Sequence, residues 1–364
     1  MTGNTNILTS EATLLLKEMI TIPSTSFNED KVCNHLCQWM DSKGIVHQRK
    51  GNNIIARLSE QNGVEQEAFL QKPTLMLCAH IDTVEPSKEY SFDPYIPDYG
   101  NLPAGIVAGL GSNDDGASVV SMIATFRHFM EVGANTDILL VLTSEEERSG
   151  MNGMTGLWSE LKDQVNMAIV GEPTGMKAAT AERGLLVIDA TAHGISGHAA
   201  RNEGKNALYI ALEDIDKLRN HTFEKISPRM GKVNLNVTQI NAGTAHNVIP
   251  DTCSFVVDIR PNEMYDNEEI LNELQQICQS ELKARNLSNR SSATGEGSAL
   301  LKIVEEAGIE TFSSPTTSDW MRISCDAIKM GPGESSRSHR KDEFVFIWEI
   351  DKAISTYINL IERL

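Results

Sequence analysis

The chain has 364 residues, of which 40% are apolar, so it is long enough to form two domains with sizeable cores. Its formal net charge of −18 argues against a nucleic-acid groove or an anionic membrane surface as the main partner, since both attract basic faces. No apolar run approaches the roughly 20 residues that span a bilayer, and the first residues have neither a basic start nor an apolar stretch, so we expect a cytoplasmic protein.

Helical and strand patterns alternate over the first 176 residues. Ser10 is expected to cap the first helix, which carries Leu14, Leu15 and Met19. Apolar runs without polar alternation follow, and such runs suit strands that are buried on both faces of a largely parallel sheet. These runs are residues 73–78, 137–142, 167–170 and 328–330. The order of elements predicts an α/β domain with a mostly parallel sheet.

From about Leu185 the pattern changes to that of half-buried strands. Residues 232–238 and 253–259 alternate between apolar and polar side chains, and helical patterns occupy 207–219 and 267–284. With a final strand, this order is that of a split βαβ, or ferredoxin-like, α+β domain. The polar stretch 288–298 is expected to return the chain to the first domain. We therefore expect a catalytic domain from 1–177 and 291–364, with 178–290 inserted as a lid and dimerisation domain.

Four of five polar fragments follow the buried strands, and in parallel sheets ligands gather beyond the carboxyl ends of the strands. The fragments are His80-Ile81-Asp82, Asn113-Asp114-Asp115-Gly116, Glu145-Glu146-Glu147, Gly171-Glu172-Pro173 and Ser338-His339. Imidazole and carboxylate are the ligands that zinc or cobalt accepts when no thiolate is offered, and the six cysteines include no Cys-x-x-Cys pair. The fragments predict a hydrolytic site with two divalent metal ions, most simply Zn²⁺, with Co²⁺ as the alternative.

Each side chain can be given a role at such a site. An aspartate can bridge two metal ions, and one His and one further carboxylate then complete each ion. The expected ligands are His80, Asp114, Glu147, Glu172 and His339. Asp82 is placed to accept a ring N–H from His80 and so to fix its tautomer. Glu146 is expected to act as general base on the attacking water and then to pass the proton to the leaving amine.

These motifs resemble those of the co-catalytic zinc family, of M20 type, that includes acetylornithine deacetylase, succinyl-diaminopimelate desuccinylase, aminoacylase and glutamate carboxypeptidases. The resemblance covers nearly the whole chain, and it rests on motifs at residues 80–82, 109–114, 144–147, 171–173, 196–199, 247–250 and 331–333. It implies the same five ligands and a lid that mediates homodimer formation. The usual Asp-x-Lys-Gly is here Asp114-Asp115-Gly116-Ala117, without a lysine. Because three glutamates stand in a row at 145–147, the base and the metal ligand could each be shifted by one position. Glu146 is kept as the base because Glu145 aligns with the aspartate of the usual family motif Ser-Asp-Glu-Glu.

The resemblance also implies roles for residues outside the metal cluster. His198 would reach the active site of the partner subunit and stabilise the oxyanion. Asn247 and Arg260 would hold the substrate from the lid, Arg260 by pairing with a carboxylate. Ser318 and Asp319 match a segment that approaches the substrate. The peptide bond between Asp114 and Asp115 is expected to be cis.

For function, the resemblance implies hydrolysis of the amide of a small N-acyl amino acid in arginine biosynthesis. The expected substrates are N-acetylornithine, N-acetylcitrulline or the N-succinyl equivalents. Succinyl-diaminopimelate desuccinylase is the first alternative, and a dipeptidase or aminoacylase on the same scaffold is the next. A protein that binds metal or ligand without catalysis is a further alternative, but it has no need of Glu146. Arg337, Arg340 and Lys341 would favour a carboxylate-bearing acyl group, although a solvated loop explains them equally well.

Overall fold

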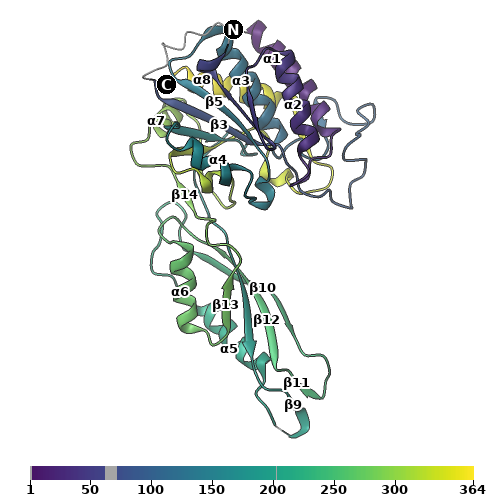
Figure 1. The fold of residues 1–364 in the computed structure, drawn as a ribbon, viewed down its shortest axis with the longest axis vertical. Helices are drawn as coiled ribbons and strands as arrows, with labels where there is room; N and C mark the ends of the chain where they lie inside the picture. Colours follow the sequence, from purple (N-terminus) through teal and green to yellow (C-terminus); the bar gives the residue numbers. More distant parts are fainter. Residues whose placement is uncertain (1, 62–71, 202) are drawn as a thin grey trace. The chain divides into compact units, whose positions relative to one another are not determined.

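The computed structural model describes residues 2–61, 72–201 and 203–364. The chain forms two compact units (Figure 1). The first unit contains residues 1–180, 294–312 and 318–364, and the second contains 181–293 and 313–317. Among the described residues, no helix combines the length and the apolar character needed to cross a membrane.

The first unit combines a large sheet with helices on both of its faces (Figure 1). Its helices are α1 (Thr2–Ile20), α2 (Asp30–Ser42), α3 (Gly116–Val132), α4 (Met154–Leu161), α7 (Ala299–Glu306) and α8 (Ile347–Ile361). The sheet has the order β1-β2-β5-β3-β6-β16-β7-β14, and β15 pairs with β7. The strands are β1 (Gln48–Lys50), β2 (Asn53–Arg57), β3 (Thr74–His80), β5 (Asp137–Thr143), β6 (Met167–Val170), β7 (Ala178–Glu182), β14 (Ser292–Ala293), β15 (Thr311–Ser314) and β16 (Asp326–Lys329). The residues of β14 belong to the second unit, and β7 and β15 continue into it. A separate pair joins β4 (Ile106–Ala108) to β17 (Phe344–Phe346).

The centre of this sheet is parallel, because β5, β3, β6 and β16 all run in one direction. Every residue of β3 is buried, and its side chains alternate between two cores. Leu75 and Leu77 pack with α1, α2, α3 and α8, whereas Met76 and Cys78 pack on the side of α4. A strand covered on both faces has an uninterrupted apolar sequence. The predicted α/β sheet with buried parallel strands is therefore confirmed.

The second unit is an antiparallel sheet in the order β10-β12-β8-β13 with two helices. Its elements are β8 (Leu186–His193), α5 (Ala207–Asn220), β10 (Asn234–Ala242), β12 (Thr252–Arg260), α6 (Asn267–Ile277) and β13 (Glu281–Ala284), with the short pair β9 (Gly197–His198) and β11 (Val248–Ile249). The apolar side chains of β8 and β12 pack against α5 and α6 in one core. The predicted α+β fold with strand-helix-strand-strand-helix-strand order is confirmed.

Two predicted helix boundaries were wrong. The helix expected over 267–284 ends at Ile277, and residues 281–284 form β13, in which Leu282 is buried between exposed neighbours. Ser10 does not cap the first helix, because α1 begins at Thr2 and the Ser10 hydroxyl donates to the carbonyl of Asn6. Leu14, which was expected on the apolar side of this helix, is 60% exposed. The stretch 288–298 returns the chain to the first unit at residue 294, as expected, and it also contains the short strand β14.

Candidate metal centre

Parallel strands deliver the polar fragments to one edge of the large sheet. His80 is the last residue of β3, and it lies opposite Thr143, the last residue of β5. The short helix η3 (Glu146–Arg148) follows β5, and Glu172 lies two residues beyond the end of β6. Asp114 lies two residues before the start of α3. The peptide bond between Asp114 and Asp115 is cis, as expected.

The carboxylate of Asp114 lies between two histidines. Its Oδ1 is 3.1 Å from His80 Nε2, and its Oδ2 is 3.6 Å from His339 Nε2. Glu147 Oε1 is 3.0 Å from the same nitrogen of His339. Because its two oxygens face different imidazoles, Asp114 has the arrangement of a carboxylate that bridges two cations.

Two overlapping groups of side chains have all their ligand atoms within 4.8 Å of one another. One contains His80, Asp114 and Glu147, and the other contains His80, Glu146 and Glu172. With His339, the structure brings together all five predicted ligands and the predicted base. The donors are imidazole nitrogens and carboxylate oxygens only, which suits zinc or cobalt in an N/O site. The residues present therefore fit a pair of divalent cations.

The charges of the cluster favour cation binding. Burial raises the pKa of Glu146 and Glu172 well above the ordinary value, and neighbouring carboxylates raise both further. Burial lowers the pKa of His80, but contacts with Asp114 and Asp82 outweigh it and raise that pKa well above its ordinary value. Carboxylates gathered in a buried place repel one another, and bound cations relieve this repulsion.

The three consecutive glutamates differ in what they contact. The carboxylate of Glu145 accepts hydrogen bonds from the backbone N (3.0 Å) and side-chain Nδ2 (2.7 Å) of Asn152, and it takes no part in the two ligand groups. Glu146 and Glu147 contribute carboxylates to those groups instead. This geometry favours 146 and 147, and not 145 and 146, as the pair of base and ligand.

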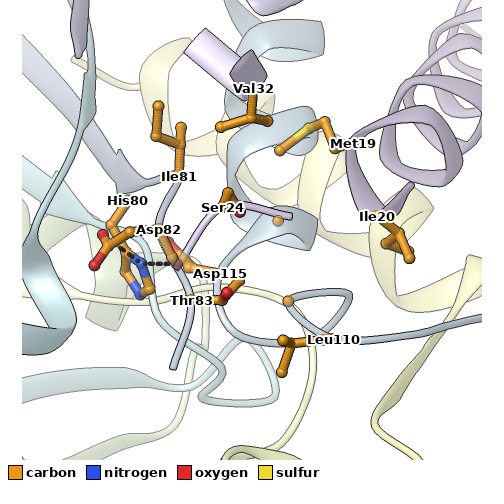
Figure 2. Close-up of a pocket in the computed structure, with 12 residues that line it drawn as sticks. Met19, Ile20, Ser24, Val32, His80, Ile81, Asp82, Thr83, Leu110 and Asp115 are labelled. Atoms are coloured by element: carbon orange, nitrogen blue, oxygen red, sulfur yellow. Dashed lines mark hydrogen bonds and ion pairs between the residues drawn. The ribbon is translucent and has the colours of Figure 1, made fainter. Parts of the chain in front are cut away.

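Asp82 faces Nδ1 of His80 with both its backbone carbonyl and its carboxylate. The nearest partner of His80 Nδ1 is the backbone carbonyl of Asp82 at 3.0 Å, and the carboxylate oxygen is 3.4 Å away (Figure 2). The Asp82 carboxylate accepts the Ser26 hydroxyl at 2.7 Å and the backbone N–H groups of Glu146 and Glu147 at 3.0 and 3.1 Å. Asp82 therefore holds the turn that carries the base as well as the histidine.

Ser318 and Asp319 are buried in the first unit. Ser318 accepts a hydrogen bond from Trp320 N at 3.3 Å and so caps a short helix. The Asp319 carboxylate accepts the Thr143 hydroxyl at 2.7 Å, beneath the end of β5, and burial raises its pKa to about 6. Their contact with a substrate stays a prediction.

The second unit carries the remaining predicted residues. His198 is exposed on β9, and its Nδ1 accepts a hydrogen bond from Ala200 N at 3.2 Å. Asn247 is also exposed. It lies beside His198, because its backbone carbonyl accepts the N–H of Ala199 at 3.0 Å. Arg260 already has a carboxylate partner, because it donates to both oxygens of Asp258 at 2.9 and 3.1 Å. The roles of these three residues at the active site stay predictions.

Arg337 is not available to a substrate, contrary to one of the two interpretations of the basic residues near His339. It donates to both carboxylate oxygens of Glu349 at 2.9 and 2.6 Å, and its side chain is only 14% exposed. Its guanidinium also lies over the ring of Phe344, 4.9 Å from the centroid. It therefore ties the loop of His339 to the start of α8.

Three buried residues at the site were not predicted. Glu29 accepts hydrogen bonds from the backbone N of Phe27 and of Glu145 at 2.7 and 3.2 Å. Glu343 accepts the backbone N–H groups of Asn113 and Asp114. Asn113, which lies in a predicted fragment but was given no role of its own, accepts the N–H of Glu334 with its side chain. Glutamate in a loop usually indicates a solvated side chain, so the sequence carried no signal for these contacts.

Comparison with known proteins is consistent with this geometry. The sequence pattern of the peptidase dimerisation domain matches residues 180–286, and that of peptidase family M28 matches residues 53–193. A probable carboxypeptidase of Talaromyces marneffei is 24% identical over 97% of this chain and 86% of its own length. A succinyl-diaminopimelate desuccinylase of Corynebacterium glutamicum is 25% identical over 92% of each protein. The solved structure of a dinuclear metal-binding peptidase from the M20 family of Bacillus subtilis shares the fold, with a TM-score of 0.73 over 98% of each chain at 14% identity.

Proposed function

Because the chain belongs to the M20 peptidase family, we propose that this metal-dependent hydrolase cleaves the amide of an N-acyl amino acid. The observation that carries the proposal is the position of Asp114, whose two oxygens face His80 and His339. The motifs at Glu172 and His339 resemble those of deacylases acting on ornithine or citrulline derivatives. We infer N-acetylornithine, N-acetylcitrulline or an N-succinyl equivalent as substrate, which places the reaction in arginine biosynthesis.

In this proposal two sets of ligands share Asp114. His80 with Glu172 forms one set, and His339 with Glu147, whose nearest atoms are 3.0 Å apart, forms the other. Two bound divalent ions, with zinc as the simplest choice, would lower the pKa of water and polarise the acyl carbonyl.

Glu146 performs the proton transfers in this proposal. Its carboxylate lies within 4.8 Å of ligand atoms of His80 and Glu172, and Asp82 holds its backbone N–H at 3.0 Å. It accepts a proton from the attacking water as the C–O bond forms. It then gives that proton to the amine nitrogen as the C–N bond breaks, so the products are a carboxylic acid and a free amine.

We further infer a homodimer that forms through the second unit, since the dimerisation-domain pattern covers residues 180–286. In such a dimer His198 would contribute to the active site of the partner. The exposed position of His198 on β9 leaves its ring accessible for this role.

Succinyl-diaminopimelate desuccinylation is the second candidate. It is favoured by the similarity to the Corynebacterium glutamicum desuccinylase over 92% of this chain. This reaction breaks the same kind of bond, an amide between an acyl group and an amino-acid nitrogen. The two candidates differ only in the groups on either side of the bond.

A substrate panel tests the proposal. Amine release by the zinc-loaded protein is measured with acetylornithine, acetylcitrulline, succinylornithine, succinylcitrulline, succinyl-diaminopimelate and a plain dipeptide. The proposal predicts the highest kcat/KM for an ornithine or citrulline derivative. A preference for succinyl-diaminopimelate would support the second candidate, and cleavage of the dipeptide alone would make the protein a peptidase. Glu146→Gln protein serves as the control for contaminating hydrolases.

A further inference from the structure

A carboxylate from the C-terminal part of the chain holds the loop that carries Asp114. Glu343 is 2% exposed, and its Oε1 accepts hydrogen bonds from the backbone N of Asn113 at 2.8 Å and of Asp114 at 3.0 Å. Its Oε2 accepts the N–H of Gly111 at 3.2 Å. Three backbone donors around Asp114 thus converge on one side chain, which fixes the course of this loop.

A second connection runs from the Asp114 loop to the segment before His339. It is made by the side chain of Asn113, which is fully buried. Its Oδ1 accepts the N–H of Glu334 at 3.0 Å, and its Nδ2 donates to the carbonyl of Glu334 and to the hydroxyl of Ser338, each at 3.2 Å. Gly333 permits this approach, because a Cβ there would lie 2.3 Å from Asn113 Oδ1. Asn113 therefore fixes the segment that leads directly into His339.

These two connections matter because the two histidines are supported differently. His80 is the last residue of β3, so the sheet ladder fixes its backbone. His339 lies in an irregular loop with a φ of 56°, a left-handed conformation that non-glycine residues adopt only when their surroundings enforce it. The hydrogen bonds of Asn113 and Glu343 support the chain on either side of His339, in addition to the ion pair between Arg337 and Glu349.

We propose that Asn113 and Glu343 are positioning residues that hold Asp114 and His339 at the spacing required by a shared metal ion. The proposal rests on the metal centre of the proposed function and adds an asymmetry to it. Loss of either side chain weakens the ion held by Asp114, Glu147 and His339 more than the ion held with His80. Ligands must be held within tenths of an ångström, so second-layer partners of this kind govern metal affinity.

The second unit supplies a matched control for a merely structural role. Asp214 is also fully buried, and its carboxylate accepts backbone N–H groups of Gln279 at 2.9 Å and of Ser280 at 2.7 Å. It resembles Glu343 in burial and in the kind of bond it makes. It belongs to the other unit and to neither set of ligands. Asp214→Asn should therefore lower stability without changing metal binding.

The test is a titration of the metal-free, full-length protein with Zn²⁺ in competition with a chromophoric chelator. The parent and Asp214→Asn are expected to bind two ions with the same affinities. For Asn113→Ala and Glu343→Gln we expect one ion to weaken by about 10- to 100-fold and the other by less than about threefold. Asn113→Asp keeps the acceptor for Glu334 N and should be intermediate.

Circular dichroism first establishes that each variant is folded, and Asn113→Ala decides the matter if Glu343→Gln does not fold. Folded variants that bind both ions as tightly as the parent would overturn the positioning role and leave the metal centre intact. Equal weakening of both ions would also overturn it, because the proposed asymmetry would be missing. A parent that binds fewer than two ions would overturn the metal centre and this inference together.

Discussion

Replacing Glu146 with glutamine tests the proposed chemistry with the smallest change in shape. The amide cannot take a proton from water, yet Asp82 still holds the backbone N–H of residue 146, so the turn should keep its position. Neither set of proposed ligands loses a member. General acid–base catalysis typically contributes about 10²- to 10⁴-fold. We therefore expect kcat to fall by that factor, which corresponds to about 2.7–5.4 kcal/mol of transition-state stabilisation.

The assay is amine release at saturating substrate, with bound zinc measured in the same samples. Glu145→Gln is the matched control, because the carboxylate of Glu145 bonds to Asn152 and takes no part in the ligand groups. It should retain kcat within a few-fold of the parent. A Glu146→Gln protein that holds two ions and keeps kcat within about threefold would refute the assignment of the base. Loss of activity in Glu145→Gln instead would show that base and ligand are shifted by one residue.

Further predictions concern pH, the His339 loop and the dimer. A hydrogen bond to Glu147 raises the pKa of His339 to about 9, and burial raises the pKa of Glu343 to about 8. The folded metal-free chain therefore binds more protons than the unfolded chain between about pH 5 and 9, so its Tm should fall as pH rises through this range. The increase in Tm that Zn²⁺ produces should grow over the same range. A Tm of the metal-free chain that rises with pH would contradict this prediction. Arg337→Ala should cost about 3 kcal/mol in chemical denaturation because it leaves Glu349 buried without its partner, and a loss below about 1 kcal/mol would count against the pair. Inactive Glu146→Gln and His198→Ala proteins should recover partial activity when mixed, and no recovery despite demonstrated subunit exchange would argue against a role in trans.

The sequence predicted the parts of the site that depend on local pattern. The run 167–170 matches β6 residue for residue, because a continuous apolar stretch between polar residues indicates a buried strand. Once the strands were placed, the rule that ligands gather at their carboxyl ends brought the polar fragments together. This was sufficient to expect His80 and Glu172 at one edge of the sheet.

The sequence did not predict contacts between distant segments. Glu343 is 230 residues from Asn113, and its partners are backbone N–H groups, which every residue type except proline carries. No residue type therefore signals this bond. Asp82 illustrates the same limit, since its place near His80 was expected but its hold on the turn at Glu146 was not.

The over-long helix prediction at 267–284 has a similar cause. No glycine or proline interrupts residues 278–280, so the sequence contains no local stop signal. In the structure the carboxylate of Asp214 accepts the N–H groups of Gln279 and Ser280. This tertiary contact holds the bend that leads from α6 into β13.

Anomalous diffraction from crystals of the zinc-loaded protein tests the central claim most directly. The account predicts two zinc peaks per chain that share the carboxylate of Asp114, one beside His80 and Glu172 and the other beside Glu147 and His339. A single peak, or zinc bound away from Asp114, would contradict the paired-metal centre and the proposed function built on it.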